Sequence, residues 1–246
     1  MQQAPGPPPA IPSAGWAVLH LAFALREPLS AAAAAKAGAL VAEIEAEADY
    51  QVRAYAVLGQ QAHLGLMLVG PDFARLNQFR HALRSAFGGA VEERPDLGFV
   101  SVTEASEYLE DDGSEAATAR RQGRLYPADL PRTRMVCFYP MRKRREAHAN
   151  WYMLDFEARK RLMYGHGKTG RTFAGRVTQL ITAATGLSDW EWGVTLFADD
   201  PKAIKDIVYE MRYDEGSALY AEFGPFAVGL VAPFADALVE SGAVVT

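Results

Sequence analysis

Two spacings of hydrophobic residues alternate along the chain, one typical of strands and one typical of helices. In residues 16–25, leucine and phenylalanine occupy every second position from Leu19 onward, which predicts a strand with one buried face. Ser30 then precedes an alanine-rich segment. A serine at this position is a common helix cap, so we expect a helix from there to about Ala48.

The next segments complete a recognisable supersecondary unit. The runs "QVRAYAVLG" and "AHLGLMLVG" are separated by a glutamine-rich turn and predict a β-hairpin. Asp72 is placed to cap a second helix that ends near Phe87, and "LGFVSVTE" predicts a further strand. The order β-α-β-β-α-β is that of a ferredoxin-like unit, which we place at residues 15–110.

The second half of the chain repeats much of this order. A polar stretch begins with "DDGSEAATARRQG", and we expect residues 111–132 to form a linker. After it the pattern predicts a strand at 135–141, helical segments over 155–184, a strand at 190–198, a helix at 201–213 and a strand at 221–231. Residues 133–246 are therefore expected to form a second ferredoxin-like unit. The predicted fold class is α+β, with the two antiparallel sheets joined into a barrel.

The first residues differ from the rest in composition. Residues 1–14 are rich in proline and glycine, and we expect a disordered tail there. They lack the basic and apolar regions of a secretion signal, and no apolar run approaches the roughly 18 residues of a membrane span. The single cysteine, Cys137, excludes a disulfide framework and a cysteine-based zinc site. We therefore expect a cytoplasmic protein.

The net charge of the chain is −5, with one basic cluster at Arg142–Arg145. An acidic protein repels nucleic acid, and the chain has no recognisable nucleic-acid reader motif, so we expect no nucleic-acid partner. Concentrated positive charge is suited to a local anion. A solvated basic turn after a strand is the alternative interpretation.

One glycine-rich segment, "YGHGKTGR", is similar to a phosphate-binding loop at first sight. That loop requires a glycine where this chain has Leu162, and it must follow a strand, so we exclude a nucleotide-triphosphate site. What remains is His166 between Gly165 and Gly167. Small neighbours allow a flat group to approach an imidazole, which is the usual protein ligand of haem iron. A surface histidine at a helix junction is the alternative.

A tyrosine and several cations in the same half have complementary chemistry. Tyr139 could give an electron and a proton to an oxidised metal centre, and Lys143 could hold a carboxylate. Arg171, Arg176 and Arg212 could hold further carboxylates. Each of these side chains could instead be a solvated residue at the end of a strand or on a helix.

Five strings in this half together resemble a known family: "CFYPMRKRR", "NWYML", "HGKTGR", "DWEWGVTLFADD" and "YEMRYDEGSALYAEFGPF". They are similar to coproheme decarboxylases, which belong to the chlorite dismutase-like superfamily. The resemblance is dense over residues 134–230. It implies two ferredoxin-like halves, a homopentamer, and iron coproporphyrin III (coproheme) as both substrate and redox centre. Hydrogen peroxide then drives decarboxylation of two of its four propionates to vinyl groups, which gives haem b.

The resemblance also implies roles for individual residues. Tyr139 corresponds to the tyrosine that becomes a radical, Lys143 to its accompanying lysine, and His166 to the proximal ligand of the iron. Gln179 corresponds to the polar residue over the distal face of the iron. The residues that correspond to substrate-binding positions are Met141, Arg171, Gln179, Trp190, Arg212, Ser217 and, with a spacing shifted by one, Arg124.

Two other functions stay open at this point. Chlorite dismutase activity is associated with an arginine over the distal face, where this chain has Gln179, and a neutral amide holds an anion less well. A haem carrier would need neither Tyr139 nor Lys143. The chain also departs from the family, since Arg142 replaces a residue that is usually small and no additional distal histidine is evident.

Overall fold

The structure is a computed structural model that describes residues 13–59, 62–108 and 113–244. Of the residues expected to form a disordered tail, 1–12 lie outside this part, whereas residues 13 and 14 belong to the first strand. The elements of the N-terminal half are β1 (Ser13–Leu25), α1 (Ala31–Glu45), β2 (Gln51–Leu58), β3 (Leu64–Gly70), α2 (Phe73–Phe87), β4 (Val91–Glu93) and β5 (Phe99–Ala105). Apart from the short β4, this is the order that the sequence predicts.

The C-terminal half begins with α3 (Glu115–Leu125), β6 (Met135–Lys143) and the short hairpin of β7 (Arg145–Glu146) and β8 (Ala149–Asn150). It continues with α4 (Phe156–Arg171), β9 (Thr178–Ala183), β10 (Trp192–Ala198), α5 (Pro201–Met211), α6 (Glu215–Ala218), β11 (Ala221–Phe223), β12 (Ala227–Val231) and α7 (Phe234–Glu240).

The local chemistry of the chain explains where the main helices begin. Ser30, Asp72, Asp155 and Asp200 each precede a helix, and each side chain accepts a hydrogen bond from a backbone N–H of the first turn. Such caps satisfy donors that have no partner within the helix. The caps at Ser30 and Asp72 are those that the sequence predicts.

Three predictions for the C-terminal half are corrected. Residues 115–125, expected to be a loop, form α3, because Ser114 caps an alanine-containing segment there. Residues 178–183, expected to be helical, form the strand β9. The strand expected over 221–231 is divided into β11 and β12 by Gly224 and Pro225, since a proline has no N–H to donate to a ladder.

Among the described residues, each half contributes four antiparallel strands to the ring of one ten-stranded sheet, and β4 and β11 pair with β1 and β6 outside that ring. The N-terminal strands are ordered β5-β1-β3-β2 and the C-terminal strands β9-β10-β6-β12, which is the same ferredoxin-like order twice. Pairing of β2 with β12 and of β5 with β9 joins the halves, so the eight strands form a closed ring. The β5–β9 contact has only two residue pairs, so the ring is less regular than the predicted barrel.

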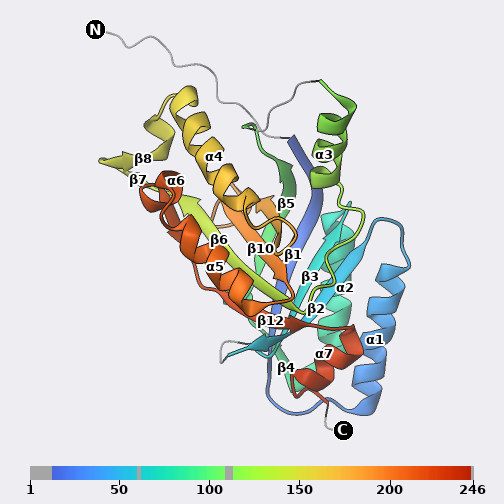
Figure 1. The fold of residues 1–246 in the computed structure, drawn as a ribbon. Helices are drawn as coiled ribbons and strands as arrows, with labels where there is room; N and C mark the ends of the chain where they lie inside the picture. The colour runs from blue at the N-terminus through green and yellow to red at the C-terminus, as the bar shows by residue number, and fades with distance from the viewer. Residues whose placement is uncertain (1–12, 60–61, 109–112, 245–246) are drawn as a thin grey trace.

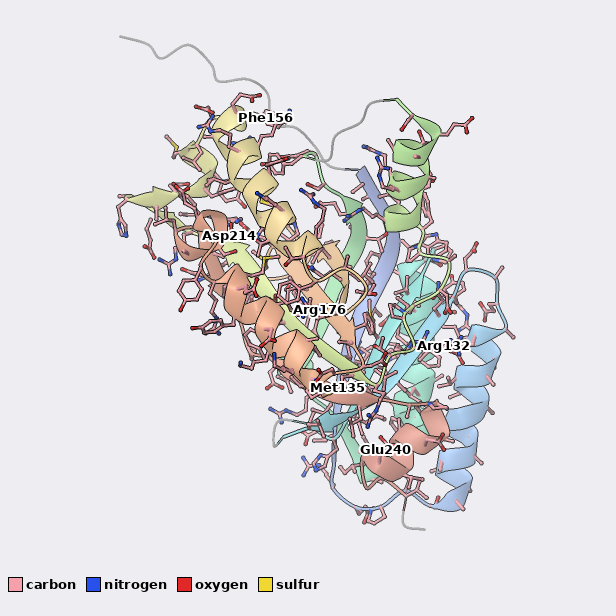
Figure 2. The ribbon with its side chains drawn as sticks, in the orientation of Figure 1. Arg132, Met135, Phe156, Arg176, Asp214 and Glu240 are labelled. Carbon is pink, nitrogen blue, oxygen red and sulfur yellow. The ribbon has the colours of Figure 1, made fainter. Side chains whose placement is uncertain are left out.

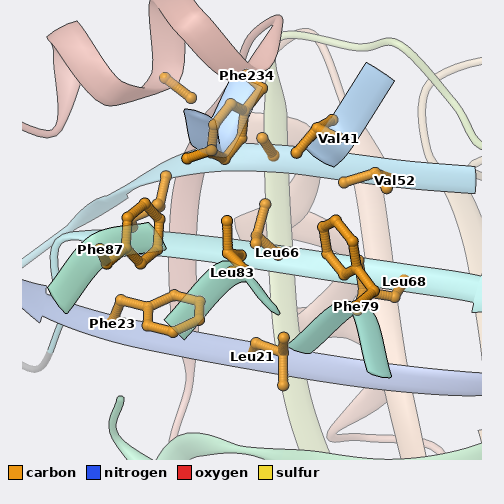
Figure 3. Packing of buried hydrophobic residues seen from close by; sticks show 14 of the residues in the cluster. Leu21, Phe23, Val41, Val52, Leu66, Leu68, Phe79, Leu83, Phe87 and Phe234 are labelled. Atoms are coloured by element: carbon orange, nitrogen blue, oxygen red, sulfur yellow. The ribbon is translucent and has the colours of Figure 1, made fainter. Parts of the chain in front are cut away.

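The ring separates two environments for side chains. Its inside is filled by Val18, Tyr55, Met67, Val136 and Phe197, among others. On the outside, α1, α2 and α7 cover the N-terminal strands, and Figure 3 shows Phe23, Leu66, Phe79 and Phe87 packed between them. The outside of β6, β9 and β10 is covered by α4 and α5 instead (Figure 1). None of the described helices has the length and apolar character needed to cross a membrane.

Candidate functional site

The outer face of β6, β9 and β10 carries a regular grid of side chains. Register pairs Tyr139 with Val194, and Val194 with Ile181. Directly paired residues of neighbouring strands point to the same face, so these three side chains form one row. The row on one side contains Cys137, Leu196 and Gln179, and the row on the other contains Met141, Trp192 and Ala183. Tyr139 thus lies at the centre of the β6 column.

Helix α4 lies over this grid but buries no side chain completely. None of its residues, all of which the structure describes, is fully buried, whereas α5 buries Ala203, Ile204 and Ile207. Met141 and Ile181 on the grid are also only partly buried. The region between α4 and the sheet is therefore bordered on both sides by side chains that are only partly buried. We call this region the slot.

Gly170 marks how closely α4 approaches the sheet. A methyl group added at Gly170 would lie 3.4 Å from Nε2 of Gln179 and 3.1 Å from Cε of Met211. Gln179 therefore faces α4 about one helical turn beyond His166, and Met211 brings α5 to the same place. Any larger residue at Gly170 would narrow the slot.

His166 is held by a carboxylate on the neighbouring helix. Its Nδ1 lies 2.8 Å from Oδ2 of Asp214 and 3.4 Å from the Ser217 hydroxyl. Asp214 lies alongside α4, between the levels of Phe156 and Arg176 (Figure 2). Burial alone would raise the pKa of Asp214, but hydrogen bonds from His166 and Ser217 outweigh it and lower that pKa. An ionised Asp214 accepts a hydrogen bond from the Nδ1–H of His166, which leaves Nε2 as the nitrogen with a free lone pair.

This arrangement fits a haem-type iron. Histidines that bind metals almost always donate their other ring N–H to a carboxylate or carbonyl, which fixes the tautomer and makes the metal-binding nitrogen more basic. Nε2 of His166 has no hydrogen-bond partner among the described residues. No cluster of three or more His, Cys, Asp or Glu residues suited to a bare metal ion occurs in the described part of the chain. A single imidazole beside an apolar slot suits an iron porphyrin better.

Tyr139 is buried between aromatic rings, with only 8 % of its surface exposed. It stacks on Phe226 with ring centres 4.4 Å apart and meets Phe223 edge-on at 5.7 Å. Burial raises the pKa of Tyr139, and the positive charge of Arg212 partly opposes this change. The charge of Arg212 is therefore close enough to Tyr139 to lower the pKa of its phenol.

Lys143 lies on the same face of β6 as Tyr139, but its ammonium group points beneath α6. Nζ donates to the carbonyl of Gly216 at 3.0 Å and lies 4.1 Å from the centre of the Trp151 ring. Burial lowers the pKa of Lys143 to about 8, despite the nearby carboxylates of Asp214 and Glu191. Gly216 lies two residues after Asp214, so Lys143 and His166 contact the same short segment of the chain.

Two other members of the basic cluster, Arg142 and Arg145, have carboxylate partners of their own. Arg142 pairs with Glu222 at 2.6 Å, and Arg145 pairs with the buried Glu191. Glu191 also accepts the backbone N–H of Lys143 at 2.8 Å. These ion pairs neutralise the charges of Arg142 and Arg145 near the end of β6, so the two arginines do not form a free anion-binding site.

The structure brings together some of the predicted site residues and separates others. Tyr139, Met141 and Gln179 share the grid, and Arg212 acts on Tyr139. Ser217, which the resemblance implies binds a propionate, contacts His166.

The two remaining arginines lie apart from Tyr139. Arg171 is exposed at the last residue of α4, with its guanidinium 5.8 Å from the Tyr164 ring. Arg124 lies on the last turn of α3, which packs on β5 and β1. No contact in the described part of the chain joins either arginine to Tyr139 or His166.

Trp190 lies on the opposite side of β6 from Tyr139. It packs on Phe99 and Phe138 at the mouth of the ring, where these residues line a hollow of about 400 Å³. Arg142 lies over its ring at 5.2 Å. The tryptophan that faces the slot is Trp192, two residues later.

Sequence reasoning missed three residues of this region. Trp192 could have been found from the strand alternation, because it shares the parity of Val194 and Leu196. Asp214 and Glu104, whose carboxyl accepts the indole N–H of Trp192 at 3.4 Å, are distant in sequence from the residues they contact. No local sequence signal identifies them.

A family model described as chlorite dismutase matches residues 30–232. This range covers most of the chain. The chain belongs to the chlorite dismutase family.

Solved structures of similar proteins agree with this assignment. A haem-binding protein from Thermus thermophilus shares 38 % sequence identity over 96 % of this chain and 98 % of its own, with a TM-score of 0.85. The chlorite dismutase of Candidatus Nitrospira defluvii, in complex with imidazole, shares 18 % identity over 93 % of this chain and 95 % of its own, with a TM-score of 0.75. The second likeness concerns the fold alone.

Proposed function

We propose that this chain binds an iron porphyrin in the slot through His166 and acts as a coproheme decarboxylase that forms haem b with hydrogen peroxide. The observation that carries the proposal is the contact of His166 with Asp214, because His166 is part of α4, the helix that lies over the grid with Tyr139 in its central row (Figure 1). The haem-binding relative from Thermus thermophilus supports the choice of ligand class. The sequence resemblance supports coproheme as the particular porphyrin.

The proposed reaction balances with peroxide as oxidant. A propionate side chain, –CH2–CH2–COO⁻, becomes a vinyl group and carbon dioxide with loss of two electrons and one proton. Hydrogen peroxide takes up two electrons and two protons to form two molecules of water. When bound, the iron porphyrin supplies the centre at which peroxide is reduced.

Tyr139 is suited to relay these oxidising equivalents. Because burial raises its pKa, the phenol stays protonated at neutral pH, and loss of an electron must be accompanied by loss of the proton. The resulting radical can take a hydrogen atom from the propionate carbon next to the ring. Stacking on Phe226 fixes the phenol in one orientation. The charge of Arg212 attracts a propionate to the same place.

The decisive experiment is to load the purified protein with iron coproporphyrin III, add hydrogen peroxide in small steps and analyse the extracted porphyrin by mass spectrometry. We expect the successive loss of two carboxyl groups, ending at haem b. We expect Tyr139→Phe to bind the porphyrin and form no haem b, and Tyr50→Phe, in the N-terminal half, to behave as wild type. Normal turnover by Tyr139→Phe would disprove the radical role.

Chlorite dismutation is the second candidate, because the family model carries that description. Gln179 argues against it, since a neutral amide on the grid attracts an oxychlorine anion less than a guanidinium does. Oxygen release from chlorite by the haem-loaded protein, measured with an oxygen electrode, would favour this candidate. Tight porphyrin binding without turnover of either oxidant would favour a haem carrier.

We also propose a homopentameric assembly, on the basis of the sequence resemblance. Mass photometry of the purified chain gives the oligomeric state directly. A mass near 26.8 kDa would correspond to a single chain and contradict this part of the proposal.

A further inference from the structure

The slot has opposite charge at its two edges. On the β6 side, Arg212 is near Tyr139 and Lys143 is buried beneath α6. On the β5 side lies Glu104, and Glu107 follows three residues later. In the strand order β5-β9-β10-β6, these two groups lie on opposite sides of the grid.

Register places Glu104 on the face that carries the grid. Val102 pairs with Ala183, which pairs with Trp192, so these three side chains share a face. Glu104 is two residues beyond Val102 on β5 and therefore points the same way. The indole N–H of Trp192 donates to Oε1 of Glu104 at 3.4 Å, which is a direct contact between the carboxyl and the grid.

Glu104 is only partly exposed and forms no ion pair with any residue that the structure describes. Burial raises its pKa, the Trp192 hydrogen bond opposes this, and the negative charge of Glu107 raises it further. Two cations of the adjoining elements form no contact with Glu104. Arg159 of α4 donates to the Tyr108 hydroxyl at 3.0 Å, and no contact joins Arg124 of α3 to Glu104 in the described part. This edge is therefore acidic.

We propose that Glu104 is a specificity residue that orients the iron porphyrin by keeping its carboxylates away from the β5 edge. This inference rests on the proposed function, since it assumes that the slot holds an iron porphyrin. Carboxylates that approach Glu104 are repelled in a partly desolvated site, whereas those near Arg212 are attracted. The porphyrin is expected to bind with its least acidic edge toward β5.

This orientation should distinguish the type III isomer of coproporphyrin from the type I isomer. Type III coproporphyrin has one edge, between two of its pyrrole rings, that carries only methyl groups. Type I coproporphyrin carries one propionate on every edge. Type III can therefore face Glu104 without bringing a carboxylate near it, and type I cannot. The two isomers have identical charge and composition, so any difference in affinity reports the placement of the carboxylates.

The test is equilibrium binding of iron coproporphyrin III and iron coproporphyrin I to the porphyrin-free protein, followed by Soret absorbance without peroxide. We expect wild type to prefer type III by about fivefold at low ionic strength, on the scale of a partly screened pair of like charges. Glu104→Gln keeps an acceptor for Trp192 and removes the charge. It is expected to bind type I more tightly, so that the preference largely disappears. Glu240→Gln, an equal charge change on α7, should keep the wild-type preference.

A second measurement does not depend on any variant. As pH falls through the pKa of Glu104, the carboxyl becomes neutral and the preference of wild type for type III should decline. Glu104→Gln should show no such change. An equal preference for type III in wild type and Glu104→Gln, with both binding porphyrin, would overturn the orientation role and leave the proposed function intact. Failure of wild type to bind either isomer would instead refute the proposed function, and this role with it.

Discussion

At the scale of single residues, the pair of His166 and Asp214 has the most direct consequence for ligand binding. The carboxylate fixes the imidazole tautomer and leaves Nε2 available to bind a metal. Asp214 also accepts the backbone N–H of Gly216 at 3.0 Å, and an asparagine can keep that contact through its carbonyl oxygen. Asp214→Asn therefore separates the effect on His166 from the folding of α6.

We expect Asp214→Asn to weaken iron-porphyrin binding by about tenfold or more, as removal of such supporting carboxylates does elsewhere. Soret titration of the porphyrin-free protein measures the affinity, and thermal unfolding checks the fold. Glu215→Gln, the exposed neighbour on α6, is the matched control and should bind as wild type. Equal affinity of Asp214→Asn and wild type would mean that His166 does not depend on this carboxylate.

Lys143 is a buried cation. The free energy required to bury its charge should therefore appear in the pH dependence of the free energy of unfolding. The unfolded chain keeps Lys143 protonated up to its ordinary pKa of 10.5, whereas the folded chain keeps it protonated only up to about 8. Between these values the unfolded state binds more protons, so stability rises with pH. Below about pH 8 both states carry the charge and the full penalty applies, about 3 kcal/mol for a shift of this size.

We therefore expect Lys143→Met to be more stable than wild type below pH 8, with an advantage that declines as the pH approaches 10.5. Chemical denaturation of the porphyrin-free protein at several pH values measures the difference in the free energy of unfolding. Lys36→Met, which removes an exposed charge on α1, should differ from wild type by the same small amount at every pH. A pH-independent difference for Lys143→Met would show that burial does not lower this pKa.

The residues of the site could be predicted from the sequence only where a local signal exists. His166 is marked by its flanking glycines, and Tyr139 by its place at the end of an apolar run beside a basic cluster. Asp214 and Glu104 gain their roles from contacts with His166 and Trp192, which are far away along the chain. Such contacts depend on strand register and helix placement, which a single sequence does not specify.

At the scale of elements, α4 forms one side of the slot, and two of its glycines have different surroundings. A methyl group at Gly165 would meet no atom within 4 Å, whereas one at Gly170 would come within 3.1 Å of Met211 and 3.4 Å of Gln179. Replacing glycine by alanine inside a helix stabilises it by about 1 kcal/mol. Gly165 lies in the interior of α4 and Gly170 in its last turn, and the added methyl group meets neighbouring atoms only at Gly170.

We expect Gly165→Ala to raise the free energy of unfolding by about 1 kcal/mol and to leave porphyrin affinity unchanged. Gly170→Ala should gain less stability, because Met211 must move, and should bind the porphyrin several-fold more weakly. Denaturant unfolding and Soret titration of both variants test this comparison. If Gly170→Ala bound the porphyrin as tightly as Gly165→Ala, Gly170 would not border the bound porphyrin.

Helices and strands could be predicted where the spacing of hydrophobic residues agreed with the position of helix-capping residues. They were missed where these two signals did not agree. The strands and helices of the N-terminal half have clear alternation and the caps Ser30 and Asp72. β9 has the sequence TQLITA, in which apolar and polar residues do not alternate, because one face lines the slot and the other packs inside the ring. α3 is polar enough to be mistaken for a loop, and only the Ser114 cap indicates it.

At the scale of the whole molecule, the closed ring couples the two halves. They meet along β2 and β12 and along β5 and β9. In the second contact the Ser101 hydroxyl donates to the Thr182 hydroxyl at 2.8 Å, and both side chains are completely buried. Slot residues of β9 and β10 are therefore positioned partly by the N-terminal half, although we place none of the proposed catalytic residues there.

We expect Thr182→Val to destabilise the whole protein by about 1–3 kcal/mol, because the Ser101 hydroxyl loses its partner in a buried site. The double variant Ser101→Ala with Thr182→Val should recover part of this loss, since neither polar group is then left unpaired. Thr178→Val, at the exposed first residue of the same strand, is the matched control and should change stability little.

Two probes determine whether the halves unfold together. A variant that keeps only Trp16 reports unfolding of the N-terminal half by its fluorescence. A variant that keeps only Trp192 reports unfolding of the C-terminal half. Because the ring joins the halves along two pairs of strands, we expect Thr182→Val to shift both fluorescence transitions to the same lower denaturant concentration. A shift of the Trp192 transition alone would mean that the C-terminal unit unfolds independently. The shape of the slot would then be a property of that unit and not of the closed ring.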